Sequence, residues 1–66
     1  MYEKIGINAG LIWEYLSSSN GAKTLKDVKK GCKLTEKDMY AALGWLAREG
    51  KVAFNKLKDD VEVALL

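Results

Sequence analysis

Lysine is concentrated in one short segment, and this cluster is the feature of the 66-residue sequence that most suggests a chemical role. Five lysines and a single aspartate fall between residues 23 and 33, which gives this segment a net charge of +4: Lys23, Lys26, Lys29, Lys30 and Lys33. Ammonium groups at this density can bind the phosphates of a nucleic acid, because each neutralised phosphate releases counterions. The simpler interpretation is a solvated face that keeps a small domain in solution. Both interpretations stay open at this point.

The other residue types argue against an enzyme. The sequence contains no histidine and a single cysteine, Cys32. Ser-His and Cys-His catalysis, a disulfide within the chain and the common zinc sites are therefore excluded. Neither a P-loop nor a Gly-x-Gly-x-x-Gly sequence is present. We expect a non-enzymatic domain with no cofactor, no metal and no small-molecule substrate, in which Cys32 serves as a small apolar residue.

The first element that could position these residues is a helix predicted over residues 8–18. Apolar residues recur there at helical spacing and form one stripe: Ile5, Ala9, Ile12, Trp13 and Leu16. Residues 17–21 then supply a turn that ends in glycine. Leu11 and Tyr15, four residues apart, lie outside the stripe and form either a pair on the helix surface or the edge of a contact patch.

Two further helices are predicted, each begun by a threonine with an aspartate three residues later. Thr24 and Asp27 form this cap for the second helix, which we expect to end at Gly31. Thr35 and Asp38 repeat the cap for the third helix, which is expected to continue to residue 49. The inward face of the third helix is predicted to be apolar: Met39, Ala42, Leu43 and Leu46.

The C-terminal part of the chain changes to the alternating pattern of strands. A hairpin is predicted over residues 52–65, with residues 59–60 as a two-residue turn. This turn would place Phe54 opposite Leu65. Residues 23–25 are expected to add a short strand between the first and second helices.

Three helices followed by a β-hairpin wing is the order of a winged helix-turn-helix, so we expect one α+β domain over residues 1–66. The run Ala-Leu-Gly-Trp-Leu-Ala-Arg-Glu-Gly-Lys-Val at residues 42–52, with Ala9, Gly10 and Trp13 before it, carries a closer resemblance. It resembles a family of short prokaryotic winged helix-turn-helix proteins known as a domain of unknown function. The resemblance covers nearly the whole chain and implies the fold. It implies no catalytic residue, because the family has no established activity.

Winged helices that bind DNA place the third helix in the major groove and use the second helix and the wing for phosphates. Duplex DNA would then contact the lysine cluster together with three residues of the third helix: Lys37, Tyr40 and Arg48. The charge of the third helix does not favour this function, because residues 34–50 carry a net charge of −1. The wing turn also carries two aspartates where a minor-groove arm would offer arginine. Transcription-regulator-like DNA binding is therefore predicted largely from the fold.

The exposed face of the third helix supports an alternative, a protein-interaction or homodimerisation module. A mid-helix glycine costs about 1 kcal/mol relative to alanine, so Gly44 indicates that another backbone approaches closely. With Ala41 and Trp45 it forms a flat surface with an aromatic anchor. A contact of Trp45 with the first helix or the wing inside the domain would explain this residue equally well. Two other candidate interfaces are the C-terminal strand, with Leu65, because an unpaired strand edge invites pairing, and the pair Leu11 and Tyr15 on the first helix, which ranks below the strand and the Trp45 face.

We expect a homodimer, because the core of a 66-residue chain without a disulfide or a metal is marginal. We also expect a cytoplasmic protein, since the chain has a free thiol and no recognisable export signal. No apolar run approaches the length of about 18 residues that a membrane span needs.

Overall fold

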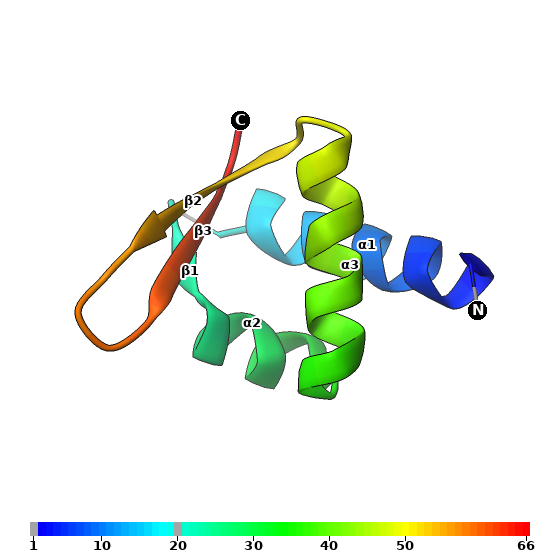
Figure 1. Ribbon diagram of the computed structural model, residues 1–66, viewed down its shortest axis with the longest axis horizontal. Helices are drawn as coiled ribbons and strands as arrows, with labels where there is room; N and C mark the ends of the chain where they lie inside the picture. The colour runs from blue at the N-terminus through cyan, green and yellow to red at the C-terminus, as the bar shows by residue number, and fades with distance from the viewer. Residues whose placement is uncertain (1, 20) are drawn as a thin grey trace.

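The computed structural model describes residues 2–19 and 21–66 and has the expected order of three helices and a C-terminal hairpin (Figure 1). The elements are α1 (Tyr2–Ser17), β1 (Lys23–Thr24), α2 (Leu25–Cys32), α3 (Glu36–Arg48), β2 (Val52–Lys56) and β3 (Val61–Leu65). In Figure 1, α3 crosses in front of α1, α2 lies below them, and the hairpin projects to the side of the helices. The fold is α+β, as predicted. No helix within the described residues is long and apolar enough to cross a membrane.

Helix α1 begins six residues before its predicted start at residue 8. Its early turns are held against α3, where the Lys4 ammonium lies 3.2 Å from the Asp38 carboxylate. Ala9, Ile12 and Leu16 are buried as expected. Trp13 is 43% exposed, so its assignment to the inward stripe was wrong. It lies at the border of the stripe and faces the side of α3. In the predicted turn, Asn20 lies outside the described residues.

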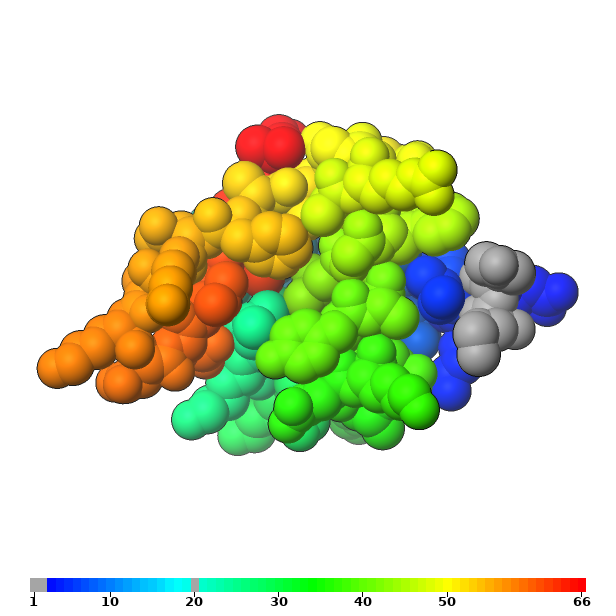
Figure 2. Space-filling model, viewed as in Figure 1, coloured from blue at the N-terminus to red at the C-terminus, as the bar shows by residue number. Residues whose placement is uncertain are grey.

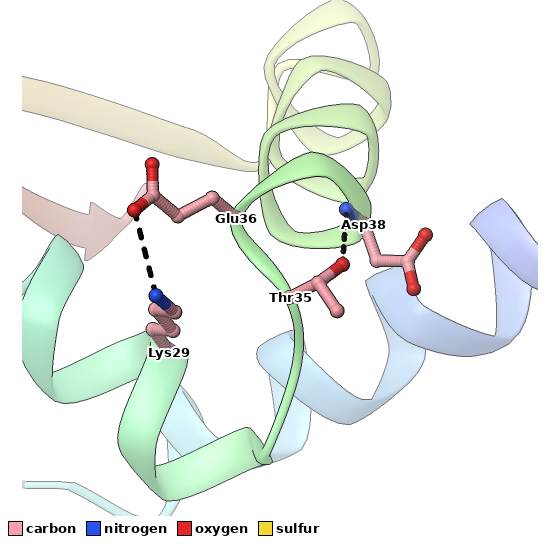
Figure 3. A network of polar contacts seen from close by, with 4 residues as sticks. All are labelled: Lys29, Thr35, Glu36 and Asp38. Atoms are coloured by element: carbon pink, nitrogen blue, oxygen red, sulfur yellow. Dashed lines mark hydrogen bonds and ion pairs between the residues drawn. The ribbon is translucent and has the colours of Figure 1, made fainter.

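The predicted threonine caps are present in the structure, one in full and one in part. At the start of α2, the Thr24 hydroxyl accepts from the Asp27 N–H at 3.2 Å and the Asp27 carboxylate accepts from the Thr24 N–H at 3.4 Å. At the start of α3 only half of the predicted cap forms: the Thr35 hydroxyl accepts from the Asp38 N–H at 3.2 Å (Figure 3), whereas the Asp38 carboxylate lies 3.2 Å from the Lys4 ammonium. Sequence spacing was sufficient here because a cap is made within four residues.

Gly31 does not end α2, which was the predicted role of this glycine. The helix continues to Cys32, and Lys33 takes the left-handed conformation of the cap, with φ of 54°. Gly31 is explained instead by the ring of Tyr15 from α1. A Cβ at residue 31 would lie 2.5 Å from Cε1 of that ring. The glycine therefore allows α1 and α2 to approach each other.

Gly31 and Gly44 should respond differently to substitution by alanine, because only Gly31 has a side chain, the Tyr15 ring, close to the position of an added Cβ. Gly44→Ala should raise the free energy of unfolding by about 1 kcal/mol, because helix propensity improves and no atom lies within 4 Å of the added Cβ. Gly31→Ala should lower it, because overpacking against the Tyr15 ring outweighs the gain in propensity. Urea unfolding followed by circular dichroism measures both. Equal stabilisation by the two substitutions would show that the Tyr15 ring moves aside freely.

The sheet contains three strands in the order β1-β3-β2, and both pairings are antiparallel. β1 is the short strand expected between the first two helices. In the hairpin, Phe54 pairs with Val63 and Lys56 pairs with Val61. The predicted two-residue turn and the pairing of Phe54 with Leu65 were therefore wrong.

A four-residue loop, residues 57–60, connects the hairpin strands, because Asp59 and Asp60 cannot easily form the tight turn. Two-residue hairpin turns require positive φ, which favours glycine or asparagine. Among the described residues other than glycine, only Lys33 has a positive φ. The loop is closed instead by the Leu57 N–H, which donates to the Asp60 carbonyl at 2.8 Å. The register shifts by two residues, so each side chain keeps its expected face.

The core lies between α1, α3 and the sheet, with Val28 entering from α2. Its buried residues are Ala9, Ile12, Leu16, Val28, Met39, Ala42, Leu43, Leu46, Val52 and Val63. The predicted inward face of α3 is confirmed, because all of its four residues are buried. Phe54, expected on the inner face of the hairpin, is 46% exposed.

Candidate functional site

The lysines of α2 form one cationic stripe opposite the buried side of the helix. At about 100° per residue, three of them lie within an arc of about 100°, Lys26, Lys29 and Lys30, and Lys33 follows as the cap residue directly after the helix. All four are exposed, whereas Val28 on the other side is fully buried. Lys23 belongs to β1, where it is half-buried and pairs with Val63. The fold thus places three of the five predicted lysines on one face of α2 and a fourth, Lys33, at its C-terminal end.

Carboxylates reduce the positive potential at one end of this stripe. The Lys29 ammonium lies 3.4 Å from the Glu36 carboxylate (Figure 3), and both side chains are exposed. A groove of about 260 Å³ beside this pair is lined by α2, α3 and the wing loop. Asp59 and Asp60 line it together with Lys26 and Lys29. In the described part of the chain, Lys30 and Lys33 form no salt bridge.

The exposed face of α3 has small residues between a lysine and an arginine, as the sequence predicted. Lys37, Ala41, Gly44 and Arg48 are exposed along it. Tyr40 and Trp45, 53% and 41% exposed, lie at its two flanks. Tyr40 lines the groove shared with α2 and the wing loop, and Trp45 lines a second groove shared with α1.

The second groove is larger, about 540 Å³, and was not predicted from the sequence. It runs between α1 and the C-terminal half of α3. Its lining residues are Gly6, Ile7, Ala9, Gly10, Leu11, Trp13, Glu14, Trp45, Leu46, Glu49 and Lys51. Both tryptophans of the chain are partly exposed here, at 43% and 41%. The uncharged run from Ile5 to Trp13 could have indicated this surface, because a helix on the outside of a domain normally exposes charge.

The structure gives mixed results for the predicted protein interface. No atom of the domain lies within 4 Å of a Cβ added to Gly44, so no internal contact explains this glycine. Trp45, in contrast, lines a groove together with residues of α1. This agrees with the alternative that Trp45 contacts the first helix inside the domain. Leu65 is half-buried and packs against the core. The edge argument for its strand was wrong, because β3 lies between β1 and β2.

Cys32 is half-buried at the end of α2 and packs against the core. Its Sγ lies 3.9 Å from the Leu11 carbonyl oxygen. Burial raises the pKa of the Cys32 thiol, which disfavours the reactive thiolate. Among the described residues, no three His, Cys, Asp or Glu side chains are grouped as metal ligands.

Comparisons with known proteins agree with this geometry. The model of the winged helix-turn-helix domain DUF2582 matches residues 1–65. The solution NMR structure of protein BT2368 from Bacteroides thetaiotaomicron is similar, with a TM-score of 0.82 and 28% sequence identity. The match covers 96% of this chain and 76% of that chain. No curated protein matches the sequence.

Proposed function

Because the chain belongs to the winged helix-turn-helix family DUF2582, we propose that it is a non-enzymatic module that binds duplex DNA, mainly through the phosphates. The observation that carries this proposal is the exposed lysine stripe on α2, next to α3 in a winged helix-turn-helix. In the usual docking of this fold, α3 enters the major groove and α2 contacts the backbone. The proposal includes a cytoplasmic location, where a free thiol such as Cys32 stays reduced.

Each residue has a defined place in this binding mode. Lys26, Lys30 and Lys33 contact phosphates, and Lys29 joins them when it leaves Glu36, since an exposed pair of this kind holds by at most about 1 kcal/mol. Lys37 and Tyr40 lie nearest the bases, and Arg48 contacts the backbone from the end of α3. The rest of the α3 face, Ala41 and Gly44 included, offers no hydrogen-bonding side chain to a base edge. Affinity should therefore depend weakly on sequence.

The expected result is a steep fall of DNA affinity as salt concentration rises. Each phosphate contact contributes about 0.9 to the slope of log K against log salt. Lys30→Gln should lower the slope by about one such contact, and the triple replacement of Lys26, Lys29 and Lys30 by glutamine should lower it further. Fluorescence anisotropy with a labelled mixed-sequence duplex, titrated at four salt concentrations, measures the slope.

Lys51→Gln is the matched control for that experiment. It removes the same charge from the turn between α3 and β2, away from the lysine stripe, and should leave the slope unchanged. Circular dichroism verifies that each variant is folded. Absence of binding at low salt would contradict the proposal, and equal slopes for Lys30→Gln and Lys51→Gln would show that net charge alone causes the attraction.

A second candidate function, protein interaction or homodimerisation, is favoured by the groove that contains Trp13 and Trp45. Partly exposed tryptophans next to small residues are typical of interface anchors. This function places Ala41, Gly44 and Trp45 at the edge of a protein contact instead of a DNA contact. Trp45→Ala would then weaken association with the partner and leave the salt slope for DNA unchanged.

A further inference from the structure

The outward face of α1 is apolar where a surface helix is normally charged. From Ile5 to Trp13 the sequence contains no charged residue. The inward side of this segment is buried, yet on the outward side Ile7 is 66% exposed and Leu11 is 44% exposed. A helix that is apolar on all sides is typical of a buried position. We propose that a second copy of this chain covers this face, and that the two α1 helices pack antiparallel across a two-fold axis.

The charges at the two ends of this face favour a second copy of the chain as the partner and an antiparallel orientation of its α1 helix. At helical spacing, four outward residues form one line, the α1 stripe: Lys4, Ile7, Leu11 and Glu14. Its ends carry opposite charges and its middle is apolar. The Lys4 ammonium also lies 3.2 Å from the Asp38 carboxylate of the same chain, and its side chain is 68% exposed, so it remains accessible to a second carboxylate. In an antiparallel two-fold dimer, Lys4 meets Glu14 of the partner subunit and Ile7 meets Leu11 of the partner subunit, each pair twice. A parallel arrangement would place like charges together. The stripe is therefore complementary to itself.

The glycines of α1 support a close approach of two helices. Gly6 and Gly10 are exposed, and no atom of the domain lies within 4 Å of a Cβ added at either position. Each costs about 1 kcal/mol of helix stability relative to alanine, and the contacts of the single domain give no reason for this cost. A second helix backbone packed beside the stripe gives a reason. The adjoining groove extends the apolar surface to Trp13 and Trp45.

This dimer is compatible with DNA binding but does not depend on it. Helices α1 and α3 pack through their buried faces, and the exposed Ile7 and Leu11 of the stripe line the same groove as Trp45 at one flank of α3. In Figures 1 and 2, α3 occupies the front of the molecule with α1 behind it, and the wing projects to one side. Dimerisation through α1 would approach the Trp45 flank of α3 and leave the Tyr40 flank and the wing accessible in both copies.

Charge reversal of the stripe tests the proposal. In sedimentation equilibrium over a hundredfold range of concentration, we expect the wild-type chain to form a dimer from its 7.3 kDa monomer. E14K and K4E should each raise the dimer dissociation constant by about tenfold or more, because each places like charges opposite each other twice. An equimolar mixture of E14K and K4E should dimerise again, since both pairs are then of opposite charge.

Lys30→Glu is the control, because it changes charge by the same amount on α2. It should leave the dimer dissociation constant unchanged and weaken DNA binding, whereas E14K should retain DNA binding. Ile7→Ser provides a test without a change of charge and should also weaken the dimer. Thermal unfolding by circular dichroism verifies that the variants fold. A wild-type monomer at every concentration overturns the proposal. An unchanged dimer dissociation constant for E14K also overturns the proposal. If the mixture of E14K and K4E fails to dimerise, the antiparallel pairing is excluded.

Discussion

Leu43→Ala is expected to lower the free energy of unfolding by about 2–5 kcal/mol. Leu43 lies on the inward face of α3, is 3% exposed, and belongs to the buried core that joins α1, α3 and the sheet. Truncation removes buried methyl groups and leaves a cavity that a small helical core cannot easily close. Because small domains are stable by only about 5 kcal/mol at the lower end of the range, this loss is comparable to the whole stability.

The matched control is Leu66→Ala, the same substitution at a side chain that is 79% exposed. It should change stability by less than about 0.5 kcal/mol. Urea unfolding followed by circular dichroism measures both variants, at one fixed protein concentration because dimerisation would add to apparent stability. A cooperative Leu43→Ala protein with almost unchanged stability would mean that α3 is rotated away from the observed packing.

Val63→Asp is expected to unfold the domain at 25 °C. Val63 is fully buried in β3, the middle strand, where it pairs with Lys23 of β1 and with Phe54 of β2. An aspartate there would place a carboxylate among apolar side chains, and burying an unpaired charge is among the most destabilising changes known. The expected loss exceeds about 4 kcal/mol. One-dimensional proton NMR and circular dichroism would detect the loss of dispersion and of helix content.

Ala53→Asp is the control for the sheet. Ala53 is exposed on β2 and pairs with Ala64, on the face of the hairpin opposite to Val63. The same introduced side chain should remain solvated there and cost no more than about 1 kcal/mol in strand propensity. Unfolding by Ala53→Asp together with tolerance of Val63→Asp would show that the two faces of the hairpin are exchanged.

The lysine stripe and the groove between α1 and α3 show which surface features can be predicted from the local sequence pattern and which cannot. The stripe on α2 could be predicted, because its members lie on one short helix, or directly at its end, and the start of this helix is set by Thr24 and Asp27. The groove between α1 and α3 could not, because it depends on how two helices far apart in the sequence cross. Trp13 illustrates the difference: its spacing fits an inward stripe, but the crossing of α3 leaves it partly exposed.

The features that could be predicted before the fold was known depend on neighbours within about one helical turn. These are the two threonine caps, the buried side of α3 and the alternation of the hairpin, since hydrogen bonds and periodicity over a few residues decide each of them. Only the tertiary structure decided the register of β2 on β3, the role of Gly31 and the position of β3 between its neighbours. The physical reason is that each of these depends on contacts between distant segments. The loop at residues 57–60 adapts to the sheet, and the Tyr15 ring needs the space beside Gly31 only once α1 packs on α2.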